Sequence, residues 1–584
     1  MKSRESLSIP DLTKALDKLV RHHDALRISF LEENNAWTQQ NNKQQFRGYE
    51  LSVHDLVNSK DRSTEAKHIT DEIQAGFNLK EGGLMKVGVM QLPEEDRILI
   101  VVHHLVVDGI SWRIILEDLA NLYNQSINKE KLKLPLKTDS FMTWGKFLTS
   151  YSSSTELLNQ KTYWLDQLNQ ETKDFPTDFD KNERGVGSVQ FELGQQVVND
   201  LLYNANRAFS TQINEILLTA LGKAVRNTFD VERFYVQMEG HGREPLSKQI
   251  DCSRTVGWFT SLYPFLIENT NTNSDFETLV AIKEALRAIP DNGVGYGVLN
   301  YLSEEELPVI TPAITFNYLG DFSNTLNSNS NETEAPFTFS EGYSGNNLSE
   351  ENSAFTTPLS VQGMIVNEEM SLTIAYREGY YSKSTIESLA KNYQNELENL
   401  IENLSVEKET RVTPADLTYK NLSLSELQKN DLDKNAADIY NLAPLQEGIF
   451  FHWLSGIDPE TYFQQIAYRI VGASLDLELV EKSYALLLDK YPILRTSFTN
   501  ELGNENLQIV WKKVENSYAQ ITVPTDLDEN EKNEFITQVK KEDRLKGFDL
   551  LSGSQMRLTV IDLMDGSYEF IWSSHHIIMD GWCI

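Results

Sequence analysis

The residues with the clearest chemical potential in this chain are two histidine pairs, each followed after three residues by Asp-Gly. They occur as HHLVVDG at 103–109 and as HHIIMDG at 575–581. A neutral imidazole can remove a proton near neutral pH. The second histidine of each pair, His104 or His576, is therefore a candidate general base, whereas His103 is predicted to be a packing residue.

The elements around the first pair are those that would hold a histidine in place. Residues 98–102 read ILIVV, which predicts a buried strand. The segment KVGVMQL at 86–92 can pair with it across PEEDR as a hairpin. After the Asp-Gly turn, WRIILEDLANLYNQ at 112–125 has the spacing of an amphipathic helix. The motif is thus predicted to lie between a strand and a helix.

The motif belongs to a larger duplication. Upstream of the two pairs lie HHDALRISF at 22–30 and KYPILRTSF at 490–498. Arg27 and His104 are 104 − 27 = 77 residues apart, and Arg495 and His576 are 576 − 495 = 81 apart. The copies are offset by 495 − 27 = 468 to 576 − 104 = 472 residues. Such an offset indicates a tandem of large domains, not a short-period repeat.

The two copies differ in the lengths that precede these landmarks. The second copy starts near Tyr440, 495 − 440 = 55 residues before Arg495, whereas 26 residues precede Arg27. We therefore expect the first copy to lack an opening segment and the second to stop at its own histidine turn. On this interpretation the sequence is a fragment.

Composition excludes several classes of function. The formal net charge of −33 argues against nucleic acid or an anionic membrane as partner, because both bind basic surfaces. Cys252 and Cys583 are the only cysteines, too few for a disulfide framework or a cysteine-based zinc site, and no metal site is predicted. The start lacks a signal-peptide core and no apolar run approaches the ~18 residues of a membrane helix. A cytoplasmic location is expected.

Strands and helices mix along the chain without strict alternation, which predicts an α/β fold with mixed sheets. Residues 321–353 are rich in Ser, Asn, Glu and Gly and are expected to form a mobile loop. Residues 405–437 are charged and show little periodicity, so they are expected to be an interdomain linker. Gly293, Gly295 and Gly297 are interpreted as a tight loop and not as a dinucleotide fingerprint.

Several further segments of the first copy carry a family resemblance. They are, in order, KTDSFMTW at 137–144, TQINEILLTAL at 211–221, EGHGRE at 239–244, RTVGWFTSLYP at 254–264, PDNGVGYGVLNYL at 290–302 and FNYLGDF at 316–322. With the histidine motif they resemble the condensation-domain superfamily of nonribosomal peptide synthetases, which is related to chloramphenicol acetyltransferase. EGHGRE, GYGVLNY and FNYLG resemble its epimerization subtype. In the second copy, APLQEG at 443–448 and LRTSF at 494–498 resemble a condensation domain, although Lys490-Tyr491 stands where the family often has Arg-His.

The resemblance implies a fold and a domain order. The fold is a two-lobed acetyltransferase-like pseudo-dimer with mixed sheets, followed by the first lobe of a second copy. Residues 1–175 and 176–404 would be the two lobes of an epimerization domain, the first lacking its amino-terminal segment. Residues 438–584 would be the first lobe of a condensation domain, incomplete at its carboxyl end.

The resemblance also implies site residues. His104 and Glu239 would face each other across a tunnel and act as acid and base on the two faces of an α-carbon. Asn317 and Tyr318 are candidates for orienting or stabilising groups. Arg243 would either orient Glu239 or pair elsewhere.

By the same resemblance, Asp108 is structural and pairs with Arg27, and Asp580 pairs with Arg495 in the second copy. His576 would lie near the attacking amine of a condensation reaction. A condensation domain that follows an epimerization domain typically takes a D-configured donor, which implies D-to-L amide formation in a complete enzyme. In this chain the second copy, lacking its second lobe, is expected to be inert.

The implied substrate is an aminoacyl or peptidyl thioester on the phosphopantetheine arm of a carrier domain. No cofactor is expected to bind directly to this chain. No Gly-Gly-x-Ser carrier motif occurs in it, so the implied partners are an upstream carrier domain and further modules of a synthetase. Two alternatives remain open: amide formation by both copies, and a non-catalytic docking module.

Overall fold

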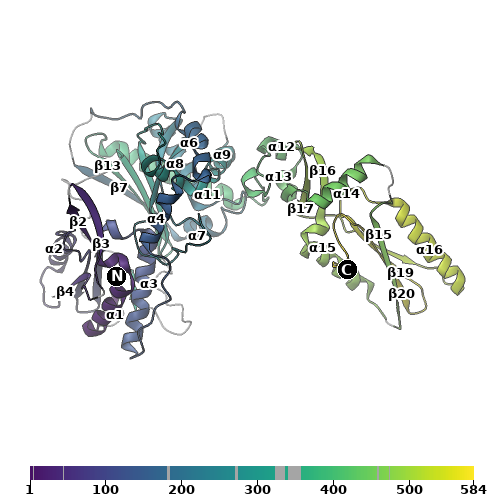
Figure 1. Ribbon diagram of the computed structural model, residues 1–584, viewed down its shortest axis with the longest axis horizontal. Helices are drawn as coiled ribbons and strands as arrows, with labels where there is room; N and C mark the ends of the chain where they lie inside the picture. Colours follow the sequence, from purple (N-terminus) through teal and green to yellow (C-terminus); the bar gives the residue numbers. More distant parts are fainter. Residues whose placement is uncertain are drawn as a thin grey trace. The chain divides into compact units, whose positions relative to one another are not determined.

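The computed structural model describes most of the chain (Figure 1). The residues it does not describe are 4–5, 34, 44, 181–184, 270–273, 323–335, 340–356, 457–459, 473 and 584. Most of the loop expected at 321–353 therefore lies outside the described residues. None of the helices that are described is both long and apolar enough to cross a membrane.

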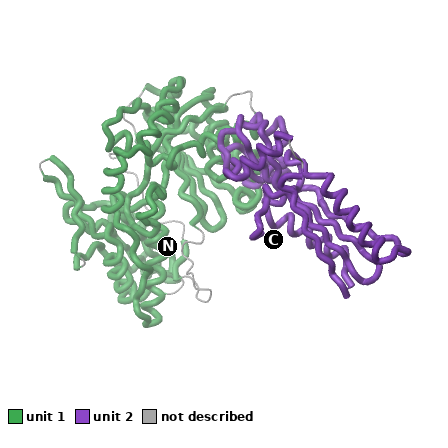
Figure 2. The backbone as a smooth tube through the Cα atoms, turned by 45° about the vertical axis from the view of Figure 1, so that its right-hand side comes forward, with its two compact units in different colours: residues 1–205, 212–405 green, residues 206–211, 406–584 purple. Residues whose placement is uncertain are grey.

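The chain divides into two compact units (Figure 2). The first comprises residues 1–205 and 212–405, and the second comprises residues 206–211 and 406–584. Each contains one copy of the histidine motif.

The first sheet of the first unit carries the histidine pair at the end of a central strand. Its strand order is β11-β1-β6-β5-β4. The bounds are β1 (Lys2–Ser3), β4 (Tyr49–Asp55), β5 (Met85–Gln91), β6 (Asp96–Val102) and β11 (Phe337–Thr338). The hairpin predicted from the sequence is confirmed, because β5 and β6 pair antiparallel, with Val89 opposite Ile98.

Helices cover both faces of this sheet. They are α1 (Ile9–His22), α2 (Arg62–Gln74) and α3 (Gly109–Ile127). Side chains of α1 and α3 pack with Val87, Val89 and Ile98 in one core, whereas α2 packs against Leu99 and Val101 on the other face. This arrangement follows from the alternation of side chains along β6. A separate hairpin pairs β2 (Ile28–Glu33) with β3 (Ala36–Asn41).

The second sheet of the first unit has the order β7-β13-β12-β10-β8-β9. Its strands are β7 (Val186–Leu193), β8 (Arg233–Gly240), β9 (Ser261–Glu268), β10 (Ile314–Asp321), β12 (Leu359–Val366) and β13 (Glu369–Arg377). Strand β10 runs parallel to both β8 and β12, and the other neighbours are antiparallel. The mixed sheet predicted from the sequence is confirmed.

Helices α7 (Gln195–Tyr203), α8 (Ile213–Phe229), α9 (Asp275–Arg287) and α11 (Lys383–Val406) accompany the second sheet. Tyr393 of α11 is fully buried, packs its ring on Phe191 of β7 and donates a hydrogen bond to the Leu217 carbonyl of α8. The same unit contains α4 (Phe141–Tyr151), α5 (Thr155–Asn159), α6 (Lys161–Leu168) and α10 (Val294–Leu302).

The glycine-rich segment differs from its prediction. Gly293 does form a tight turn, with φ of 85° and with the Tyr263 ring where a β-carbon would stand. Gly295 and Gly297, however, lie within α10. Val294, Val298 and Leu299 are buried on one face of this helix. Their burial offsets the low helix propensity of the two glycines.

The second unit repeats the motif's setting. One sheet has the order β14-β17-β16, with β14 (Ala436–Asn441), β16 (Thr496–Leu502) and β17 (Glu505–Trp511). The other has the order β15-β20-β19-β18, with β15 (Phe463–Val471), β18 (Tyr518–Thr522), β19 (Met556–Asp562) and β20 (Ser567–His575). Its longer helices are α14 (Pro444–Ser455), α15 (Leu477–Lys490) and α16 (Glu529–Lys546). Strand β18 is parallel to β19, and β19 is antiparallel to β20. The first unit has the same arrangement, in which β4 is parallel to β5 and β5 is antiparallel to β6.

The segment 405–437 is folded, which corrects its prediction as a linker. It contains α12 (Leu424–Lys429), α13 (Leu432–Asn435) and the start of β14. Leu417, Leu422 and Leu427 are buried in a cluster with residues of β14 and β17. These leucines lie in short irregular turns, so they show no single period along the sequence.

Candidate active site

His104 stands at the first turn after the central strand β6. It begins a single 3-10 turn, His104–Val106, directly before α3. Its side chain is exposed, and its ring meets the Trp258 ring edge-on at 5.2 Å. His103, in contrast, packs its ring on Phe77, and burial lowers the pKa of His103. The second histidine is thus the accessible one of the pair.

Glu239 lies near the end of β8, and Asn317 lies on the neighbouring strand β10. The Asn317 amide donates a hydrogen bond of 2.5 Å to Glu239 Oε2. Burial raises the pKa of Glu239, and His104 acts on the same carboxyl in the opposite direction. A carboxyl group with a raised pKa exchanges protons more readily near neutral pH. The structure therefore brings His104, Glu239 and Asn317 together.

Tyr318 does not join them by a hydrogen bond. Its hydroxyl is buried and has no hydrogen-bond partner among the described residues, and burial raises the pKa of Tyr318. Because successive side chains of a strand point to opposite faces, Tyr318 shares its face with Phe316 and not with Asn317. The structure therefore shows no contact of the Tyr318 hydroxyl that would support its predicted stabilising role.

Strand β10 is irregular just after these two residues. Its register against β12 shifts between Tyr318 and Asp321, and Gly320 there has φ of 89°. Arg113 of α3 donates a 2.9 Å hydrogen bond to the Leu319 carbonyl, and its guanidinium lies over the Phe322 ring. A β-carbon on Gly320 would lie 2.3 Å from Arg113 Nη2. The helix after His104 thus holds the strand of Asn317 through this bulge.

We predict that Gly320→Ala destabilises the first unit by about 1–3 kcal/mol, since alanine would adopt a left-handed backbone and displace Arg113. Gly83→Ala is the matched control, because Gly83 has φ of 68° and nothing within 4 Å of its β-carbon position. Hydrogen exchange as a function of urea, measured in peptides from β12 and β13, gives both values. Equal losses in the two variants would show that the Arg113 contact contributes nothing.

Asp108 is buried and joins the histidine motif to the EGHGRE segment. Arg243 pairs with it through two hydrogen bonds, of 2.7 and 3.1 Å, and the backbone N–H of Phe259 donates a third at 3.0 Å. The Ser111 N–H donates a fourth at 2.7 Å, which makes Asp108 the N-cap of α3. The predicted structural role fits this geometry, but the predicted partner is wrong: it is Arg243, not Arg27.

Arg27 instead binds carbonyl groups at the end of α1. Its guanidinium donates to the carbonyls of Val20 and Arg21 at 2.5 and 2.9 Å and pairs with Asp24 at 2.6 Å. The last carbonyls of a helix lack intrahelical partners and attract cations. These acceptors lie within seven residues of Arg27, so they occupy it locally.

Arg495 repeats this role in the second unit and is not paired with Asp580, which corrects the second predicted ion pair. It donates hydrogen bonds to the carbonyls of Leu488 and Asp489 at the end of α15, at 2.9 and 3.2 Å. Asp580 accepts a hydrogen bond of 3.0 Å from the Trp582 N–H. Arg27 and Arg495 are therefore equivalent residues of the two copies, as the duplication predicts. Their shared role is to cap a helix, not to bind the aspartate of the histidine motif.

A segment whose role the sequence analysis missed runs from Arg254 to Phe259. Helix α3 holds it at several points: Asp118 binds Arg254 at 2.6 Å, and Ser111 Oγ both accepts from and donates to the backbone of Gly257. This fixes Trp258 beside His104. The RTVGWF motif contains this tryptophan, but the sequence alone does not place it beside His104.

One group of possible metal ligands, His22, His23 and Asp118, occurs among the described residues. His23 Nε2 is 2.8 Å from Asp118 Oδ2, and the other carboxylate oxygen pairs with Arg254. The carboxylate is thus already compensated by side chains, which accounts for the cluster without an ion.

Comparison with known proteins adds the family. The condensation-domain model matches residues 1–423 and 436–584. The chain belongs to the condensation-domain family. Bacitracin synthase 1 of Bacillus licheniformis is 34% identical over 579 residues, covering 98% of this chain and 11% of that protein. Gramicidin S synthase 1 of Brevibacillus brevis is 35% identical, covering 71% of this chain and 39% of that protein. This condensation-family chain therefore spans well under half the length of these relatives, which are nonribosomal peptide synthetases.

Solved structures confirm the fold of this condensation-family chain. The epimerization domain from the third module of tyrocidine synthetase B is 33% identical, with a TM-score of 0.66 over 69% of this chain and 90% of that domain. The condensation domain of Monacolin K polyketide synthase has a TM-score of 0.56 over 69% and 92%, at 15% identity. The latter shows the fold alone. The predicted acetyltransferase-like α/β class is confirmed.

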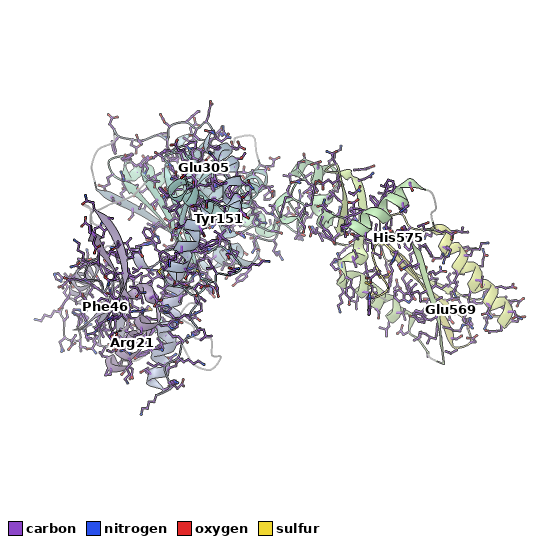
Figure 3. All side chains as sticks on the ribbon, viewed as in Figure 1. Arg21, Phe46, Tyr151, Glu305, Glu569 and His575 are labelled. Atoms are coloured by element: carbon purple, nitrogen blue, oxygen red, sulfur yellow. The ribbon has the colours of Figure 1, made fainter. Side chains whose placement is uncertain are left out.

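In the second condensation-family copy, the backbone N–H of His576 donates to the Tyr462 carbonyl at 2.8 Å, and His576 Nδ1 is 2.6 Å from the Met579 carbonyl. The Gln464 amide nitrogen is 3.2 Å from the same Nδ1, so the carbonyl is the closer partner. A carbonyl only accepts, so this contact favours a proton on Nδ1, which leaves the lone pair of a neutral ring on Nε2. Figure 3 marks His575 and Glu569, both on β20.

Acid is expected to destabilise this second copy through His575. Burial lowers the pKa of His575 from 6.5 to about 4. The unfolded chain therefore takes up the proton first as the pH falls, and stability present above pH 6.5 is lost progressively toward pH 4, on the order of 3 kcal/mol. Hydrogen exchange in β19 and β20 peptides measures this loss. His575→Asn keeps an acceptor for the Ile577 N–H but cannot be protonated, so it should flatten the pH dependence. An equally steep profile in this variant would assign the loss to another group.

Proposed function

We propose that the first unit inverts the α-carbon of an aminoacyl or peptidyl thioester carried on the phosphopantetheine arm of a carrier domain. The observation that carries this proposal is the acid/base pair: an accessible His104 and a half-buried Glu239 with a raised pKa, close enough for His104 to act on its charge. The sequence identity with a solved epimerization domain supports it.

The chemistry needs two groups on opposite faces. One base removes the α-proton, the electron pair passes into the thioester as an enolate, and an acid on the other face returns a proton to the same carbon. Neutral His104 can serve as the base while protonated Glu239 serves as the acid, and the roles exchange for the reverse direction. The Asn317 amide holds the Glu239 carboxyl in one orientation by its hydrogen bond.

For the second unit we propose a contribution to an amide-forming site that takes a D-configured donor and in which His576 lies near the attacking amine. Its Nε2 lone pair is suited to accept a proton from an amine. The implied partners of both units are carrier domains and other modules of a synthetase.

The test is deuterium incorporation at Cα. A phosphopantetheinylated carrier loaded with an L-aminoacyl group is incubated with the chain in D₂O, hydrolysed, and analysed by chiral chromatography and mass spectrometry. Deuterium in a mixture of D and L forms is expected. Unchanged L-amino acid without deuterium would contradict the proposal.

A further inference from the structure

A cavity beside Glu239 has no role in the mechanism above. Its volume is about 570 Å³, and residues of α4, β8, β9 and α10 line it. Gln237, Leu262 and Pro264 are among them, and the sheet register pairs Glu239 with Leu262 and Gln237 with Pro264. Paired and alternate residues of a sheet share a face. The cavity therefore opens on the same face of β8 as the Glu239 carboxyl.

The walls of this cavity suit an uncharged group. None of the described residues that line it carries a charge, although Asp and Glu number 86 in the chain. Trp144, Phe259 and Tyr296 supply aromatic surface, and Val298 supplies aliphatic surface. Such walls favour an apolar occupant, because a charge placed there would lose its hydration without a partner.

Gly297 keeps the cavity open. It lies in the middle of α10 and lines the cavity, and a β-carbon there would meet nothing within 4 Å. Gly295, two positions earlier, is different, because its β-carbon would lie 2.0 Å from the Gln160 side chain. A glycine inside a helix costs about 1 kcal/mol relative to alanine. Close packing against Gln160 explains why residue 295 is a glycine. At position 297 no neighbour requires a glycine, and its only structural effect is to leave space in the cavity.

We propose that this cavity binds the side chain of the residue whose α-carbon is inverted, and that it selects large uncharged side chains. The inference rests on the proposed function, since it places the α-carbon at Glu239. Gln237, which lines the cavity, is two residues before Glu239 on β8. The side chain of a substrate whose α-carbon lies at Glu239 could therefore reach the cavity.

The experiment compares two substrates on one carrier. The carrier is loaded with L-phenylalanine or L-alanine, and initial rates of deuterium incorporation are measured for the unmodified chain and for Gly297→Leu. The leucine should lower the phenylalanine rate at least tenfold while the alanine rate changes less than about twofold. Gly297→Ala should give a smaller change in the same direction. Both variants should fold, since each improves helix propensity.

Gly145→Leu is the matched control. Gly145 lies in α4, also has nothing within 4 Å of its β-carbon position, and does not line this cavity. Its phenylalanine-to-alanine ratio should equal that of the unmodified chain. An unchanged ratio in Gly297→Leu would overturn the inference, and equal losses for both substrates would assign the cavity to the pantetheine arm instead. Absence of exchange for both substrates in the unmodified chain would overturn the proposed function itself.

Discussion

Replacing either member of the acid/base pair should remove inversion. His104→Ala and Glu239→Gln are each expected to lower the rate of D/L interconversion by about 10²–10⁴, the contribution of a positioned acid or base. Because the proposed mechanism assigns the two groups to opposite faces of the α-carbon, each variant should retain at most exchange from one enantiomer. The measurement is deuterium incorporation into carrier-bound L- and D-aminoacyl thioesters, followed separately.

The substitution at Glu239 is conservative in shape. A glutamine keeps an oxygen for the Asn317 amide, so loss of activity would report the missing ionisable group and not a displaced side chain. His68→Ala and Glu72→Gln provide controls of the same types, since both residues are exposed on α2. Exchange at the unmodified rate in both site variants, with either enantiomer, would refute the assignment of His104 and Glu239.

Most local elements near this site could be predicted from the sequence. The amphipathic helix predicted at 112–125 appears as α3, and the predicted hairpin appears as β5 and β6 with nearly the predicted bounds, because periodicity reports which face of an element is buried. The contact between Glu239 and Asn317 could not come from periodicity. It depends on β8 and β10 being neighbours in a sheet, and the family resemblance pointed to both residues without predicting their contact.

The ion pairs show the limit of sequence reasoning. Asp108 needed a cation, and Arg27 and Arg243 were equally suitable by charge. The choice depends on geometry: the carbonyls at the end of α1 occupy Arg27, whereas Arg243 reaches Asp108 from a segment 135 residues away. The leucines of 405–437 show a related limit. They are buried mainly by strands that lie after the segment, and they stand in short irregular turns, so their spacing has no period.

Breaking the buried pair should have the largest effect on stability. Asp108→Asn leaves the Arg243 guanidinium buried beside a neutral amide, and Arg243→Met leaves the Asp108 carboxylate with only its backbone donors. Removing one partner of a buried ion pair costs about 3–5 kcal/mol. Methionine retains an unbranched side chain over the Phe259 ring, so most of the loss in that variant should come from the charge. Hydrogen exchange as a function of urea in α3 peptides gives the two values.

The double variant decides which arginine Asp108 depends on. Asp108→Asn combined with Arg243→Met should be more stable than the sum of the single losses by about 1–3 kcal/mol, since each substitution removes the partner that the other leaves unpaired. Asp108→Asn combined with Arg27→Met should be additive within about 0.5 kcal/mol, because Arg27 caps α1 and bonds no atom of Asp108. Coupling to Arg27 and additivity with Arg243 would reverse the pairing. The first result would mean that one carboxylate both caps the helix behind His104 and anchors the segment that follows Glu239, so that the two reacting groups are positioned by the same side chain.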